Sequence, residues 1–220
     1  MARIVLLNPN TTAALTDLMV EIAREVAPAD LSVEGLTVPF GPPLITCELE
    51  LEAAARAVLS LAPVLAQRAD AVIVAAFGDP AADALATMLA KPVIGIAEAA
   101  MRIAASGGRR FVVITHTGQL VERMARRARE IGLGANCVGV LATEGDPATL
   151  MANAAALESA LKMLAHRGVE ELGAEAVIVG GGPLGGVAKR LRGRVGVPVI
   201  EAIPAAVHHV AAALGRPVTR

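Results

Sequence analysis

The sequence lacks tryptophan and tyrosine, and it has only three phenylalanines in 220 residues. Two cysteines, Cys47 and Cys137, are too few for a disulfide framework or a metal site, and the histidines show no metal-binding spacing. The formal net charge is −1, so no basic surface points to nucleic acid. Glycine, proline or charge interrupts every apolar run within about ten residues, too soon to cross a bilayer. We therefore expect no metal, nucleic acid or membrane partner.

Hydrophobic residues nevertheless make up 55% of the chain, and most of them are alanine, valine and leucine. This composition is typical of the buried strands and crossover helices of an α/β protein. Met1 is followed almost at once by a predicted strand, residues 4–7, without a signal peptide. The sequence therefore predicts a cytoplasmic protein. The alanine-rich, weakly charged helices leave homo-oligomerisation open.

Two stretches of the chain have the same pattern of a short apolar run, a turn of small residues and the start of a helix. They are residues 71–80 (AVIVAAFGDP) and residues 176–183 (AVIVGGGP), which are 105 positions apart. Each predicts a buried strand that ends at a small-residue turn.

Other segments repeat at nearly the same offset. Residues 110–117 correspond to residues 3–10 at an offset of 107, and residues 197–200 correspond to residues 91–94 at an offset of 106. This repetition predicts an internal duplication. We expect an α/β fold of two pseudo-symmetric three-layer halves, each with a small, mainly parallel sheet. The predicted units are residues 1–97 plus 203–220 and residues 98–202.

The apolar spacing also predicts individual helices. Long helices are expected over residues 48–68 and 147–167, and a shorter one over residues 79–90. A further helix over residues 118–130 carries a dense group of arginines between Arg123 and Arg129. Charges in such a group usually face solvent, so we expect a solvated helix face.

Ligands of parallel α/β sheets bind beyond the carboxyl ends of the strands. If the halves face each other, four turns surround one cleft, at residues 8–11, 75–79, 115–118 and 180–183. Helices follow these turns, so free backbone N–H groups would suit a carboxylate, an imide oxygen or an enolate. A two-sided cleft also suits inversion of a carbon centre, which needs proton-transfer groups on opposite faces. The alternatives are a duplication that serves only folding, or a simple binding cleft.

Three segments together resemble the aspartate/glutamate/hydantoin racemase superfamily, closest to its hydantoin and allantoin racemase branch. They are residues 8–12 (NPNTT), 77–80 (FGDP) and 92–101 (PVIGIAEAAM), and the similarity covers essentially the whole chain. The resemblance implies a cofactor-independent isomerase, without pyridoxal phosphate, with a place in nitrogen metabolism. Two cysteines of that family, one in each half, remove and return the α-proton.

The resemblance places those two cysteines at Ala76 and Gly181 of this chain, which are related by the same offset of 105. A thiol has a pKa near 8.5 that a helix N-terminus lowers, whereas a methyl group or a hydrogen has no titratable atom. The two-thiol mechanism is therefore not open to this polypeptide. Either these positions have been altered, or the chain is a natural divergent member.

The same resemblance implies which residues hold the substrate, through backbone N–H groups, hydroxyls and amides in the turns. Carried onto this sequence, they are Asn8, Asn10, Thr11, Ile45, Phe77, Gly78, Thr115, Thr117, Gly182, Pro183 and Leu184.

Three other residues and one run of glycines are further candidates. Asp79 is either the N-cap of the helix that begins at Pro80 or a lone general base. His116 takes the place of Pro9 in the other half, as either a loop histidine or a proton-transfer group. Cys47, near a predicted helix start, is a further ligand-contact candidate. The glycines from residue 180 lack the lysine of a phosphate loop and predict a close backbone approach to a small ligand.

The sequence thus predicts a racemase- or isomerase-family protein for a small carboxylate, amino acid or cyclic ureide such as a hydantoin. Its activity would be lost or altered by the residues at positions 76 and 181. The alternative is a non-catalytic binding protein that has kept the pocket.

Overall fold

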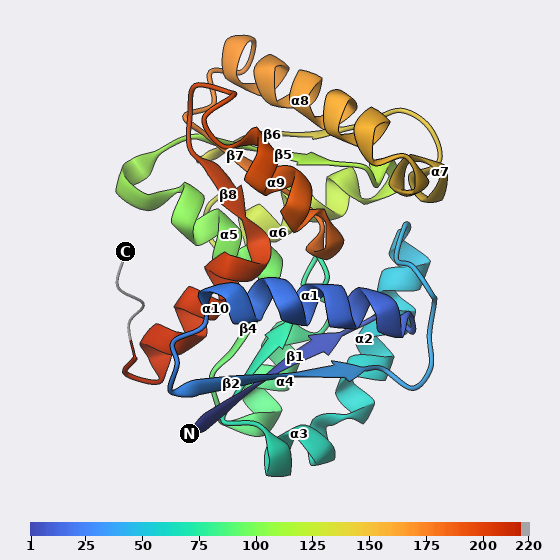
Figure 1. The fold of residues 1–220 in the computed structure, drawn as a ribbon, viewed down its shortest axis with the longest axis vertical. Coiled ribbons are helices and arrows are strands. Elements are labelled where there is room, and N and C mark those ends of the chain that lie inside the picture. The colour runs from blue at the N-terminus through green and yellow to red at the C-terminus, as the bar shows by residue number, and fades with distance from the viewer. Residues whose placement is uncertain (217–220) are drawn as a thin grey trace.

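The computed structural model describes residues 1–216 and consists of two four-stranded parallel sheets, each covered by helices (Figure 1). The strand orders are β2-β1-β3-β4 and β6-β5-β7-β8, so the second sheet repeats the first with every strand number raised by four. The predicted α/β fold of two similar halves is confirmed. The predicted unit boundaries stay a prediction, and residues 217–220 of the first unit lie outside the described residues.

The first sheet and its helices come mainly from the first hundred residues. They are β1 (Ala2–Asn8), α1 (Ala13–Val26), β2 (Leu31–Thr37), α2 (Glu48–Ser60), α3 (Ala62–Arg68), β3 (Ala71–Val74), α4 (Ala82–Leu89), β4 (Val93–Gly95) and α5 (Ile96–Ala104).

The second sheet repeats this order after a short 3-10 turn, η1 (Ser106–Gly108). Its elements are β5 (Phe111–Thr115), η2 (Gly118–Leu120), α6 (Val121–Glu130), β6 (Cys137–Ala142), α7 (Pro147–Ala152), α8 (Ala154–Glu170), β7 (Ala176–Val179), η3 (Gly182–Leu184), α9 (Gly185–Leu191), β8 (Val199–Glu201) and α10 (Ala202–Ala213).

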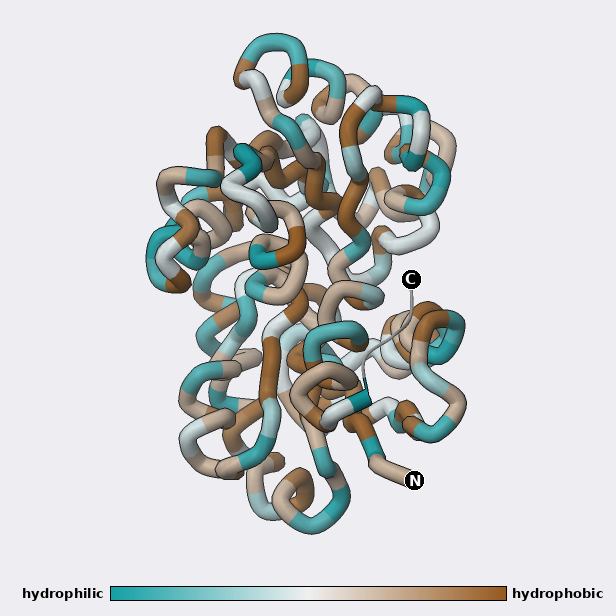
Figure 2. Tube along the Cα trace, turned by 90° about the vertical axis from the view of Figure 1, so that its left-hand side faces the viewer, coloured by the Kyte–Doolittle hydropathy of each residue, from teal (hydrophilic) through white to brown (hydrophobic). Residues whose placement is uncertain are grey.

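Alternating side chains of the central strands build three apolar clusters. On β1, Ile4 and Leu6 face a central cluster that also takes in Phe111 of β5, whereas Val5 and Leu7 face an outer cluster with α3 and α4. A third cluster lies between the second sheet and helices α8 and α9. The central cluster joins the two halves into one core. Figure 2 shows hydrophobic segments inside both parts of the molecule and hydrophilic turns on the outside.

Two helices cross from one half to the other. Helix α5 follows β4 of the first sheet but packs against β7 and β8 of the second, and α10 follows β8 but packs against β3 and β4 (Figure 1). The two helices also contact each other. Each sheet is therefore covered in part by a helix that continues from the other sheet. No helix among residues 1–216 is long and apolar enough to cross a membrane.

Three predicted helices have different bounds in the structure. The helix predicted over 48–68 breaks at Leu61, because Pro63 near the start of α3 lacks the N–H that a continuous helix needs. The helix predicted over 147–167 breaks at Asn153, whose side chain caps α8 by accepting from the N–H of Ala156 at 3.1 Å. Helix α4 begins three residues later than predicted, because Asp79 and Ala81 have positive φ angles.

The turns that follow β3 and β7 approach each other closely, and glycine makes this possible. A Cβ atom on Gly182 would lie 2.5 Å from Sδ of Met19 and 3.2 Å from the carbonyl oxygen of Ala75. A Cβ on Gly180 would lie 3.3 Å from the ring of Phe77. The predicted close approach of these glycines to a small ligand stays a prediction. In the structure, Gly180 and Gly182 approach the opposite turn.

We predict that Gly182→Ala lowers the free energy of unfolding by about 1–3 kcal/mol, because the added methyl group overpacks the contact between the turns. The matched control is Gly186→Ala in helix α9, where a Cβ would meet only the end of Arg190, at 3.5 Å. Urea unfolding checks both variants. Equal stability of the two variants would contradict a tight contact at residue 182.

Candidate functional site

A cavity of about 50 Å³ lies where the carboxyl ends of β1, β3, β5 and β7 meet. Both halves contribute to its wall, so the turns predicted to share one cleft do meet. The cavity is lined by Asn10, Leu44, Ile45, Ala75, Ala76, Phe77, His116, Thr117, Leu120, Met124, Met151, Gly180, Gly181, Gly182 and Pro183.

Equivalent side-chain turns form two walls of this cavity. In the first half, the N–H of Asn10 donates to Oδ1 of Asn8 at 3.1 Å, and Nδ2 of Asn8 donates to Oδ1 of Asn10 at 3.0 Å. In the second half, the N–H of Thr117 donates to Oγ1 of Thr115 at 3.3 Å, and the two hydroxyls lie 2.9 Å apart. Asn8 and Thr115 are buried behind the cavity and hold Asn10 and Thr117 at its wall.

Ala76 and Gly181 both line the cavity, Ala76 after β3 and Gly181 after β7. Neither has an ionisable side chain. A Cβ on Gly181 would lie 2.9 Å from Cδ1 of Leu184 and 3.7 Å from Cε1 of His116. The side chains of Leu184 and His116 therefore surround the space that a side chain at residue 181 would enter.

Within the described part of the chain, residues 1–216, His116 is the only histidine, cysteine or acidic or basic residue that lines the cavity. It is 4% exposed, and neither Nδ1 nor Nε2 has a hydrogen-bond partner among residues 1–216. Burial lowers the pKa of His116 to about 4, because the charged imidazolium loses its hydration. The imidazole is neutral at pH 7 and can accept a proton from a ligand. His116 lies in the turn after β5 as a loop histidine, but its burial excludes a surface position.

Asp79 does not line the cavity and does not cap its own helix, which corrects the expected N-cap role. Its carboxylate instead accepts from the N–H groups of Ala97 and Glu98, both at 2.8 Å, at the start of α5. Burial raises the pKa of Asp79 to about 6, against the opposing charge of Arg127 and these two N–H groups. Asp79 thus joins the cavity turn to the helix that crosses between the halves.

The arginine-rich face of α6 is not wholly solvated, which corrects a second expectation. Arg127 is 2% exposed and contacts Asp79 at 3.1 Å, Asp83 at 2.6 Å and Glu98 at 2.8 Å. Burial opposes its charge, but the hydrogen bonds to Asp83 and the nearby carboxylates raise the pKa of Arg127 above its usual value. A charge pattern alone does not reveal that carboxylates from another segment will cover one arginine.

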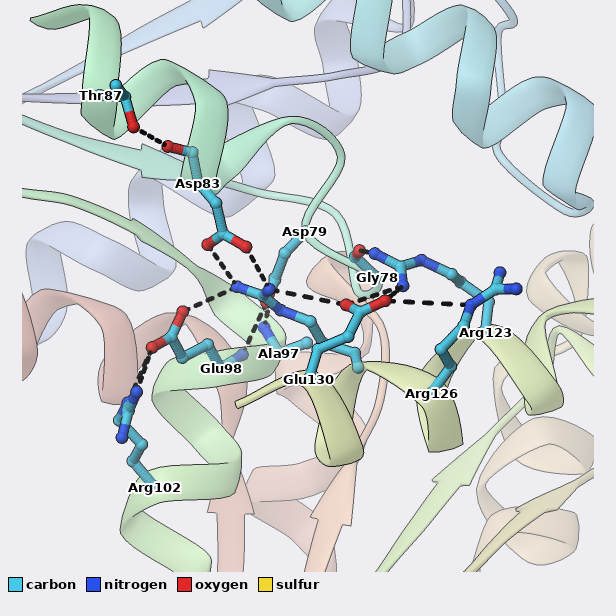
Figure 3. Close-up of polar contacts among 11 residues, drawn as sticks. Gly78, Asp79, Asp83, Thr87, Ala97, Glu98, Arg102, Arg123, Arg126 and Glu130 are labelled. Carbon is cyan, nitrogen blue, oxygen red and sulfur yellow. Dashed lines mark hydrogen bonds and ion pairs between the residues drawn. The ribbon is translucent and has the colours of Figure 1, made fainter. Parts of the chain in front are cut away.

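The same face of α6 also supports the cavity turn directly. Nη2 of Arg123 donates to the carbonyl oxygen of Gly78 at 3.2 Å, and Nη1 contacts Glu130 at 2.8 Å (Figure 3). The turn at residues 77–79 is therefore held by two arginines of the opposite half.

The structure brings most of the predicted site residues to the cavity, but not all of them. Thr11, Gly78 and Leu184 are absent from its lining, as are Asn8, Asp79 and Thr115. Cys47 is the N-cap of α2, and it too is absent from the lining, whereas its neighbour Ile45 is present.

Sequence reasoning missed several lining residues. Leu120 and Met124 lie four residues apart, a helical spacing that could have indicated a shared face. Leu44 and Met151 reach the cavity only because their loop and helix fold over it, and no local pattern indicates this.

The family model described as Asp/Glu/Hydantoin racemase matches residues 4–210, nearly the whole chain. This chain belongs to the Asp/Glu/hydantoin racemase family. The hydantoin racemase of Rhizobium meliloti is 33% identical over 229 residues, covering 96% of this chain and 88% of the relative. The hydantoin racemase of Paenarthrobacter aurescens is 31% identical over 214 residues, covering 93% of this chain and 87% of the relative.

Solved structures of family members agree with this assignment. The crystal structure of allantoin racemase from Pseudomonas fluorescens has a TM-score of 0.91 and 32% sequence identity, covering 99% of this chain and 93% of the other. In the present chain, the cavity wall has an alanine at residue 76 and a glycine at residue 181.

We predict that Arg127→Met lowers the free energy of unfolding by about 3–5 kcal/mol, because it leaves the buried Asp79 carboxylate without its partner. Arg126→Met on the same helix is the control. The side chain of Arg126 is 41% exposed, so its ion pairs lie at the surface. Their removal should lower the free energy of unfolding by less than about 1 kcal/mol. Chemical unfolding of both variants measures the difference, and similar losses would argue against a buried network.

We predict that His116 makes the protein less stable in mild acid. The imidazole titrates near 6.5 in an unfolded chain but near 4 in the fold, so the contribution of neutral His116 is complete above pH 6.5 and is lost as pH falls toward 4. Between pH 7 and pH 5 this loss amounts to about 2 kcal/mol.

His116→Gln should remove that part of the pH dependence, as measured by urea unfolding at the two pH values. His166→Gln, on a side chain that is 41% exposed, is the control and should keep the dependence of the unsubstituted protein. An unchanged slope in His116→Gln would show that the imidazole is solvated.

Proposed function

We propose that this protein binds a small cyclic ureide of the hydantoin type and acts on its α-proton without a cofactor. The observation that carries the proposal is that equivalent turns of the two halves meet at one cavity, where His116 is the one ionisable side chain that residues 1–216 contribute. Membership of the racemase family and the similarity to proteins named hydantoin and allantoin racemase support it.

The chemistry of the cavity wall favours a neutral ligand over a carboxylate or an amino acid. No lysine or arginine of the described residues lines the cavity, so a carboxylate buried there would lose its hydration without gaining an opposite charge from them. Hydrogen-bonding groups are available for an imide. Oδ1 of Asn10 accepts from Asn8 and Thr12, whereas its Nδ2 makes no hydrogen bond within residues 1–216 and is free to donate to a carbonyl oxygen.

The size of the cavity limits what it accepts. Its volume of about 50 Å³ is room for roughly four water-sized groups. A hydantoin ring is larger, so it enters only when flexible apolar side chains of the wall turn aside. Leu44 and Met151 are the residues of this kind that reach the cavity from a loop and a short helix. We therefore propose a small 5-substituent rather than a bulky one.

Binding without chemistry is the second candidate. It is favoured by Ala76 and Gly181, which give the two equivalent turns no proton-transfer group. The two candidates differ in one observable, the exchange of the α-proton of the bound ligand with solvent.

We predict that isothermal calorimetry will detect binding of 5-methylhydantoin and at least tenfold weaker binding of N-carbamoylalanine, the charged product of opening the same ring. Asn10→Asp should weaken hydantoin binding by about tenfold or more, because a donor to the ligand becomes a charged acceptor. Asn153→Asp, which keeps its capping oxygen at the start of α8, is the matched control.

Tighter binding of N-carbamoylalanine than of 5-methylhydantoin would show that the cavity takes a carboxylate and not a cyclic ureide. No binding of either compound would refute the proposed function.

A further inference from the structure

His116 stands out among the buried polar groups of residues 1–216. Only three buried side-chain polar atoms there lack a hydrogen-bond partner, and two of them are the ring nitrogens of His116. The third is Oγ1 of Thr143, whose own N–H donates to the carbonyl oxygen of Thr115, beside His116. Buried polar groups are nearly always paired, so an unpaired imidazole at a cavity wall indicates a partner that is water or a ligand.

The imidazole of His116 lies on one side of the cavity. His116 follows β5, and its Cε1 lies 3.7 Å from the Cβ that a side chain at residue 181 would have. It therefore reaches the side of the cavity to which the turn after β7 belongs. Ala76 stands on the opposite turn, after β3, and has only a methyl group.

No second proton-transfer group compensates for that methyl group. As far as residue 216, the chain contributes no cysteine, carboxylate or lysine to the cavity wall. Asp79 has its carboxylate fully engaged by two N–H groups and Arg127. Cys47 is engaged as the N-cap of α2. The two halves keep the same architecture, but proton-transfer chemistry is present on one side only.

From this geometry we infer that His116 is the single catalytic base of the cavity and exchanges the α-proton of a cyclic ureide on one face, with retention of configuration. This inference rests on the proposed function. A nitrogen of the neutral imidazole takes the C5 proton, and the C–H electron pair moves into the adjacent C4 carbonyl to give an enolate and an imidazolium. The same imidazolium returns a proton, or a deuteron after exchange with solvent, to the same face of C5.

The chemistry of the reaction follows from having one base. A two-base site delivers the new proton from the face opposite to the one deprotonated, and so inverts the carbon. A one-base site has no donor on the opposite face, so the carbon regains its original configuration. The protein should therefore label its substrate with deuterium without racemising it.

The test uses the full-length protein with each enantiomer of 5-methylhydantoin in deuterium oxide. Proton NMR follows loss of the C5–H signal, and chiral chromatography follows the enantiomer ratio, both against a protein-free sample. We expect exchange of one enantiomer at least tenfold above the protein-free rate, with fewer than about one inversion in ten exchanges. Burial lowers the pKa of His116 well below pH 7, so its contribution as a general base is smaller than that of a base matched to the operating pH. His116→Gln should bring exchange to the protein-free rate. His166→Gln should leave it unchanged.

A gain-of-function variant tests the same inference independently of whether His116→Gln folds. Ala76→Cys adds a proton-transfer group to the opposite turn, so it should convert exchange with retention into racemisation, whereas Ala76→Ser should not. The double variant Ala76→Cys with His116→Gln should lose this racemisation.

Exchange with inversion in the unsubstituted protein, exchange that persists in His116→Gln, or Ala76→Cys without racemisation would each overturn the inference. Binding of 5-methylhydantoin without any exchange would also overturn it, yet leave the proposed ligand intact. Absence of binding would instead refute the proposed function itself.

Discussion

The contact of Arg127 with three carboxylates is the interaction on which the arrangement of the cavity depends. Asp79 belongs to the turn after β3, Asp83 to α4 and Glu98 to α5. Because Arg127 itself belongs to α6, one guanidinium joins a loop and three helices. A buried charge of this kind is tolerated only when its partners are all in place, so it specifies one arrangement of these segments. The positive φ of Asp79 belongs to the same arrangement, because it aims the carboxylate at α5 and away from α4.

The two walls of the cavity have the same kind of turn but different chemical groups. Asn8 and Asn10 in one half and Thr115 and Thr117 in the other form the same kind of side-chain turn. The residue between each pair differs, however, because it is a proline in the first half and His116 in the second. The family fold thus supplies two equivalent walls, and the identity of a few side chains decides what each wall can do.

The sequence was sufficient to predict the duplication, the parallel sheets and most of the cavity wall. Those features follow from local patterns, such as the repeated apolar run before Ala76 and before Gly181. The burial of Arg127, the actual partners of Asp79 and the role of Met151 depend on contacts between segments far apart in the chain, which no local pattern encodes. The helix breaks at Leu61 and Asn153 were missed because apolar spacing continues through both.

The crossing of α5 and α10 bears on how such a molecule arose. A polypeptide corresponding to one repeat, with its own last helix, would leave part of one face of its sheet uncovered, since that helix packs on the other sheet. Two copies of such a peptide would complete each other by domain swapping, each lending its terminal helix to its twin. Fusion of two swapped copies into one gene gives the present topology, and it frees each copy to diverge. An ancestral homodimer must change both of its pocket walls at once, whereas the fused chain can lose a functional group from one wall and keep a different one on the other.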